Sequence, residues 1–158
     1  MTRINMMSKQ PQYYDIIVRD LVADNDDIVG AVILYKQLPI TEYIGELNKT
    51  ETLKIADQII EFHKSINRLP SLVNNEKIFI ESRDTLLIVV FYPNQCLLLV
   101  KAKQTDILGR IIHAIEETSQ KIQYLLDPRA AYRNGYQFFD QPKDNEIIYR
   151  NKPLSPEF

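Results

Sequence analysis

Residues 85–103 constrain the fold of this chain more strongly than any other segment. They contain two apolar runs, TLLIVVFY and CLLLVKAK, which only the three residues PNQ separate. A third run, KIFIES at 77–82, precedes them across the dipeptide RD. Parallel strands need a crossover connection of a dozen or more residues, so strands joined by links this short must pair antiparallel. The sequence therefore predicts a three-stranded antiparallel meander.

Both faces of this meander are expected to be covered by other elements. Leu86–Tyr92 and Leu97–Val100 are apolar at consecutive positions. An antiparallel sheet with one face in water would instead alternate apolar and polar residues along each strand. The chain must therefore supply helices for both sides of the sheet.

Three helices with one apolar face are predicted. The first occupies 12–25, and the second occupies 50–68 behind Asn48, whose side chain can cap it. The third occupies 105–126. A proline lies shortly after the second and the third helix and ends each of them.

Two more strands are predicted between the first two helices. The run IVGAVILY at 28–35 is too short and too rich in β-branched residues for a helix, and a weaker strand is expected near 40–47. We therefore expect an α/β protein of the α+β type with the order αββαβββα. It would form a three-layer α/β/α sandwich, with the middle helix on one face of a five-stranded antiparallel sheet and the outer two helices on the other.

The composition excludes several classes of partner. The chain has 158 residues, 45% of them hydrophobic, which suits one packed domain. Its 19 basic and 21 acidic residues give no positive field for nucleic acid. A single cysteine, Cys96, excludes an internal disulfide and agrees with a reducing cytoplasm. No apolar run reaches the length of a membrane span, so we expect a soluble, cytoplasmic protein with no membrane insertion.

No arrangement of catalytic residues is found in the sequence. His63 lies on the apolar stripe of the second helix, which indicates a buried or interface histidine. His113 lies beside Glu116 and Glu117, as a solvated ion-pair partner would, and Cys96 is interpreted as a packed thiol. None of the four glycines lies in a phosphate-binding spacing. We therefore expect no catalytic residue, no metal site and no cofactor.

The elements resemble those of a known family. The order of elements, the run IVGAVILY after a first helix, and the meander followed by a helix that contains Gly109 are similar to the roadblock family of dynein light chains and its bacterial and archaeal relatives. The resemblance covers 12–126, which we interpret as a roadblock-like domain. The segment YKQLPITEY replaces the family's usual turn after the first strand, and residues 127–158 have no counterpart in the minimal family domain.

The resemblance implies a homodimeric adaptor that carries out no chemistry. Family members pair through the edge strand of the meander and the middle helix, and they bind small Ras-like GTPases, motor subunits or signalling complexes. Some bacterial members help a partner GTPase to hydrolyse its nucleotide. Arg68 and Arg83 are the arginine-finger candidates for such a role, or ordinary surface charges. The implied dimer interface consists of Ile59, His63, Ile66, Lys77, Ile78, Phe79, Ile80 and Glu81.

The expected edge strand at 77–82 also favours pairing on physical grounds. It carries no proline and no central charge, and the open edge of a sheet exposes unpaired N–H and C=O groups. Such an edge is either paired with another chain or covered, and the preceding segment 69–75 could fold over it. The sequence leaves both alternatives open.

The last segment, 127–158, is predicted to be a tail of different composition. It contains 4 of the 8 prolines and 6 of the 15 tyrosines and phenylalanines. Aromatic side chains gain much from burial, so the tail could pack on its own domain, cross to a second subunit or bind a partner protein. The predicted partner-binding residues are Tyr132, Arg133, Tyr136, Phe138, Phe139, Tyr149 and Arg150.

A small-ligand-binding sensory domain is the alternative function. An α/β/α sandwich can leave an apolar pocket under one helix. The sequence favours the adaptor, because no converging polar group is predicted inside the core to orient a small ligand.

Overall fold

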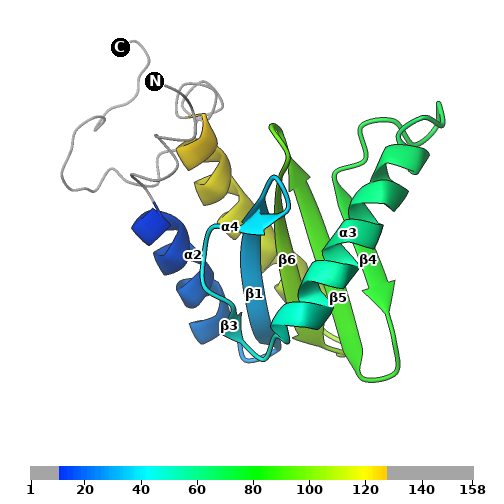
Figure 1. Cartoon of the computed structure of the whole chain (residues 1–158). Helices are drawn as coiled ribbons and strands as arrows, with labels where there is room; N and C mark the ends of the chain where they lie inside the picture. Colours follow the sequence, from blue (N-terminus) through cyan, green and yellow to red (C-terminus); the bar gives the residue numbers. More distant parts are fainter. Residues whose placement is uncertain (1–10, 128–158) are drawn as a thin grey trace, which may run out of the picture. The chain divides into compact units, whose positions relative to one another are not determined.

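The computed structural model describes residues 11–127 (Figure 1). Its elements are α2 (Pro11–Ala23), β1 (Ile28–Tyr35), β2 (Leu38–Pro39), β3 (Ile44–Gly45), α3 (Lys49–Ile66), β4 (Lys77–Glu81), β5 (Thr85–Tyr92), β6 (Cys96–Lys103) and α4 (Leu108–Leu126). The chain divides into two compact units between Ile115 and Glu116, inside α4. The first unit holds the sheet, α2, α3 and the first turns of α4. In the second unit, Thr118 and Ile122 of α4 are buried.

The sheet has the strand order β2-β1-β6-β5-β4, and β3 also pairs with β1. All pairs are antiparallel, which confirms the predicted meander of β4, β5 and β6. The link between β5 and β6 turns tightly because Asn94 and Gln95 adopt left-handed backbone angles, with φ values of 67° and 63°. Lys36 and Gln37 make a similar turn between β1 and β2.

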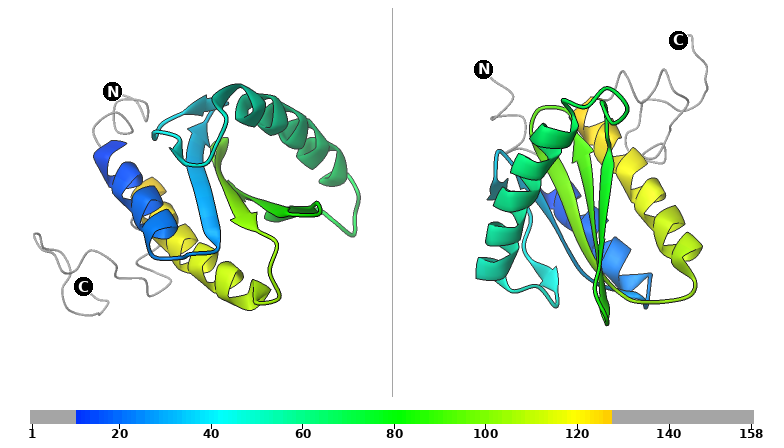
Figure 2. Two further views of the ribbon diagram at one scale, coloured as in Figure 1. Left: turned by 90° about the horizontal axis from the view of Figure 1, so that it is seen from below. Right: turned by 90° about the vertical axis from the view of Figure 1, so that its right-hand side faces the viewer.

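Helices cover both faces of the sheet, as the sequence predicts. Figure 2 shows α3 on one face, with α2 and the first turns of α4 on the other. The layer under α3 is a cluster of buried residues, Val32, Leu34, Ala56, Ile59, Val89, Leu97 and Leu99. The alternate strand residues Ile33, Ile88 and Leu98 are fully buried on the opposite face, toward α2. The expected three-layer α/β/α arrangement is therefore confirmed.

The helix ends follow local side-chain chemistry. The Asn48 side chain accepts a hydrogen bond of 2.8 Å from the backbone N–H of Glu51, which confirms the predicted cap of α3. Helix α4 begins at Leu108, three residues later than expected. The Thr105 hydroxyl oxygen accepts the N–H of Ile107 and holds a turn before the helix.

The region predicted as one strand over 40–47 is different. Only β3 lies within it, because β2 (Leu38–Pro39) precedes it, and residues 40–43 form no strand. The register on β1 shifts by two residues between β2 and β3, so this segment is bulged. Thr41 in this segment is buried, and its Oγ1 accepts the N–H of Ile33 at 3.1 Å. The hydroxyl thus replaces the backbone carbonyl that a continuous strand would offer to β1.

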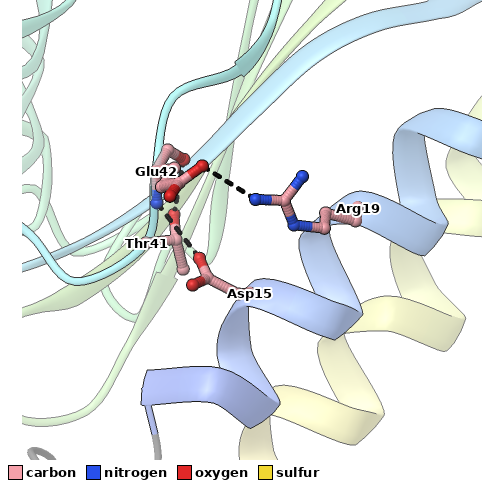
Figure 3. Close-up of polar contacts among 4 residues, drawn as sticks. All are labelled: Asp15, Arg19, Thr41 and Glu42. Atoms are coloured by element: carbon pink, nitrogen blue, oxygen red, sulfur yellow. Dashed lines mark hydrogen bonds and ion pairs between the residues drawn. The ribbon is translucent and has the colours of Figure 1, made fainter.

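Contacts with α2 hold the same segment in place (Figure 3). The backbone N–H of Glu42 donates to Asp15 Oδ1 at 3.1 Å, and the Glu42 carboxylate lies 2.7 Å from the Arg19 guanidinium. Both charged side chains of the ion pair are more than half exposed, so the pair itself adds little stability. The buried hydroxyl of Thr41 is the more important anchor.

Replacing Thr41 by valine should destabilise the protein although valine has nearly the same shape. The substitution leaves the buried N–H of Ile33 without an acceptor, at an expected cost of about 1–3 kcal/mol in the free energy of unfolding. Thr41→Ser keeps the hydroxyl and should lose much less, and Glu42→Gln should lose less than about 1 kcal/mol. Urea unfolding of the three variants measures the difference. Equal losses for Thr41→Val and Thr41→Ser would contradict the role of the hydroxyl.

Candidate functional site

Strand β4 is an open edge of the sheet (Figure 1). Within the described part of the chain, it pairs only with β5. The N–H of Phe91 donates to Glu76 O at 2.8 Å, and the N–H of Ser82 donates to Thr85 O at 2.9 Å. The direction of backbone groups alternates along an antiparallel strand. Ile78 and Ile80 are therefore bonded to β5, like Glu76 and Ser82.

The backbone groups of the three remaining residues of β4 point the other way. Lys77, Phe79 and Glu81 direct their N–H and C=O groups toward the open edge. They form a ready template for another strand. The segment 69–75, which could have covered this edge, does not form a strand beside it.

Exposed apolar side chains are concentrated in the segment that leads from the end of α3 to the open edge. Among residues 11–127, ten large apolar side chains are exposed, and six of them lie between positions 62 and 80. These six are Phe62, Leu69, Leu72, Val73, Phe79 and Ile80. We name them, together with the backbone of β4, the edge surface. Exposed apolar side chains on and next to an open strand favour contact with another protein.

A network around His63 holds the start of β4. His63 Nε2 lies 2.7 Å from the carbonyl oxygen of Asn75 and must donate to it, because a carbonyl can only accept. The His63 ring stacks on Phe91 of β5, with ring centroids 3.6 Å apart and planes 8° from parallel. Asn67 Oδ1 accepts the N–H of Asn75 at 3.2 Å. The edge strand is therefore fixed to both α3 and β5 where it begins.

The predicted interface residues occupy different environments. Ile59 is buried in the core under α3, and His63 and Ile66 are half-buried. On β4, Lys77 and Ile78 are half-buried, whereas Phe79, Ile80 and Glu81 are exposed. Four exposed residues were not predicted for this surface: Phe62, Leu69, Leu72 and Val73. The sequence signal that could have found them is that Phe62 lies outside the apolar stripe of its helix and the other three are apolar residues in a loop.

The candidate reactive side chains among the described residues are Cys96, His63 and His113. Burial raises the pKa of the Cys96 thiol to about 12, so the thiol is protonated at neutral pH. Cys96 and His63 both line a pocket beside α3, where His63 Nε2 bonds the carbonyl oxygen of Asn75. His113 is exposed. No group of three His, Cys, Asp or Glu side chains within 11–127 could hold a metal ion.

Other predicted features are less informative. Arg68 and Arg83 are both exposed. The predicted partner-binding residues of the tail, from Tyr132 to Arg150, lie outside the described residues.

None of the helices between residues 11 and 127 has the length and apolar character of a membrane-spanning helix.

A small pocket lies next to α3. Its volume is about 390 Å³, and its wall includes Ile60, His63 and Lys64 of α3 with Phe91 and Leu97 of the sheet. The wall also includes Gln37, Tyr92, Gln95 and Cys96. Two of its polar side chains have partners within the chain, because His63 Nε2 bonds Asn75 and Lys64 lies 3.4 Å from the Glu61 carboxylate. The pocket therefore has a mixed wall, in which His63 and Lys64 are already engaged within the chain.

Solved structures with the same fold were found by comparison. The structure is similar to MglB from Myxococcus xanthus, with a TM-score of 0.65 and 15% sequence identity over 75% of this chain and 91% of that chain. The fold is that of the Roadblock/LC7 domain. A Roadblock/LC7 domain from Streptomyces avermitilis matches with a TM-score of 0.55 and 17% identity over 76% of this chain and 97% of that one.

A second MglB has the same roadblock fold. The gliding protein MglB from Thermus thermophilus matches with a TM-score of 0.61 and 13% identity, over 75% of this chain and 92% of that chain. No protein-family model and no curated protein matches the sequence. At identities this low, the similarity establishes the roadblock fold and does not establish a partner.

Proposed function

We propose that this roadblock-fold protein is a non-catalytic, homodimeric adaptor that scaffolds or regulates a small Ras-like GTPase or another protein complex in the cytoplasm. The observation that carries the proposal is the edge surface. An open strand flanked by exposed apolar residues costs solubility unless another protein covers it. A further structure with this fold, an MglB with tetrameric arrangement, is an assembly of several chains in that protein.

A second copy of the same chain is the occupant that the edge surface fits best. Two copies related by a two-fold axis would each supply the strand that the other lacks, and their sheets would become continuous. The α3 residue Phe62 and the loop residues Leu69, Leu72 and Val73 would add apolar area at the same junction. Ile59, by contrast, contributes from the core by supporting α3.

The partner is proposed to bind the aromatic residues of the tail together with Arg133 and Arg150. A ligand-binding sensory domain is supported less well, since two of the polar side chains in the pocket beside α3, His63 and Lys64, are already bonded within the chain.

Two measurements test the adaptor. Sedimentation at micromolar concentration should give twice the chain mass of 18.5 kDa. Co-purification from the native cell, followed by mass spectrometry, should recover a partner protein reproducibly with the full-length chain. The same partner should be lost when the chain is truncated after Asp127. A monomer would contradict the homodimer. Undiminished recovery with the truncated chain would contradict the role of the tail.

A further inference from the structure

Strand β4 carries opposite charges at its two ends. Lys77 begins the strand and Glu81 ends it, with Phe79 between them. Residues two apart in a strand share a face of the sheet, so these three side chains lie on the same face. The same three residues direct their backbone groups toward the open edge, as the hydrogen bonds of Glu76 and Ser82 with β5 require.

We propose that two copies of β4 pair antiparallel about a two-fold axis at Phe79, so that Lys77 of each copy lies opposite Glu81 of the partner subunit. The proposal rests on the homodimer proposed above and specifies the register in which its two sheets join. The pairing uses only residues whose N–H and C=O groups face outward. It also brings two ion pairs together, one on each side of the axis.

Other registers match the edge less well. A pairing centred on Ile80 would place Lys77 opposite Arg83, and one centred on Ile78 would place Glu81 opposite the uncharged Asn75. Larger shifts would set Lys77 against its own symmetry copy, or Glu81 against its own. Like charges directly opposite each other destabilise a strand pair. Only the register centred on Phe79 pairs all five residues of β4.

The ion pair cannot form within one chain. Four residues of extended strand separate the two side chains by about 13 Å, which is too far for a salt bridge. Lys77 also makes a polar interaction within its own chain. Charge reversal at Glu81 leaves Lys77 and its interaction within the chain unchanged, so the effect on the dimer can be tested without disturbing that interaction.

The test reverses each charge in the full-length chain. Lys77→Glu and Glu81→Lys should each raise the dimer dissociation constant by about 10- to 30-fold, because each two-fold dimer would contain two repulsive pairs in place of two attractive ones. An equimolar mixture of the two variants should form heterodimers whose dissociation constant lies within about 3-fold of the wild-type value, since opposite charges again face each other. Sedimentation with one variant labelled separates these species.

Salt provides an independent control. Raising the ionic strength should weaken the wild-type dimer and strengthen the dimer of each single variant, because screening reduces both attraction and repulsion. If Lys77→Glu weakened the dimer only by breaking the interaction that Lys77 makes within its own chain, mixing with the Glu81→Lys variant would not restore dimerisation. Melting of the Glu81→Lys variant should match the wild type once both are diluted to monomers.

The outcomes separate the register from the homodimer. A wild-type chain that remains monomeric overturns the dimer, and the register with it. A wild-type dimer that neither reversal weakens, or two variants that do not prefer each other to themselves, overturns the register alone. Preferential heterodimers together with the opposite salt dependences support it.

Discussion

Phe79→Pro is expected to dissociate the proposed dimer while each subunit stays folded. The N–H of Phe79 points to the open edge, so its removal takes no hydrogen bond from the pair of β4 and β5. In a two-fold dimer the same N–H would be lost twice, and two proline rings would lie where the strands approach. We expect the dissociation constant to rise by on the order of 100-fold or more.

Two neighbouring substitutions serve as matched controls. Ile78→Pro removes an N–H that bonds β5, so it should lower the free energy of unfolding by about 3 kcal/mol, even in the monomer. Phe79→Ala keeps the N–H and should weaken the dimer far less than proline does. Sedimentation reports the assembly and urea unfolding reports the stability. A dimer that survives Phe79→Pro would show that β4 is not the paired edge.

Gly45→Ala is expected to be among the most destabilising single substitutions in the sheet. Gly45 has a φ of 78°, in the left-handed region, and a Cβ built there would overlap the carbonyl oxygen of Val29. It pairs with Gly30, where a Cβ would come within 2.9 Å of Leu47 Cγ. Backbone strain and overpacking together should cost about 3 kcal/mol or more.

Gly109→Ala is the matched control for this substitution. Gly109 lies in the first turn of α4, and apart from its chain neighbours and the nearby backbone of its own helix, no described atom comes within 4 Å of a Cβ placed there. The same change should therefore stabilise the protein by up to about 1 kcal/mol, since alanine favours the helix. Urea unfolding of both variants should give shifts of opposite sign. Shifts of the same sign would contradict the close approach of β1 and β3.

The strands and helices could be predicted wherever hydrophobic period and link length agree. The links PNQ and RD are so short that the strands they join must form an antiparallel meander. Strands β5 and β6 are apolar on both faces, so both faces of the sheet require cover. The bulge between β2 and β3 could not be predicted, because it depends on Thr41 replacing a backbone acceptor. A polar residue in a loop and one that bonds a buried strand look the same in a sequence.

The candidate site could be predicted in outline but not in detail. The sequence indicates that 77–82 is an edge strand, and the apolar stripe of the second helix includes His63. That His63 turns inward, stacks on Phe91 and bonds Asn75 depends on the path of the loop after α3. The outward direction of the Phe79 backbone likewise depends on the register of β4 on β5, which the hydrophobic pattern and the geometry of the turn set together. Because β5 is apolar at consecutive positions, its pattern alone does not select one register.

During folding, the sheet should pass through a stage with two open edges. Links of only three residues join β4, β5 and β6, so this meander can form early. Strand β1 pairs with β6 across a long interval, with Tyr35 opposite Cys96, and closing so large a loop delays the pairing. Until β1 docks, β6 exposes an apolar edge to other unfinished chains. Afterwards β6 is enclosed for the lifetime of the folded protein, whereas β4 stays accessible.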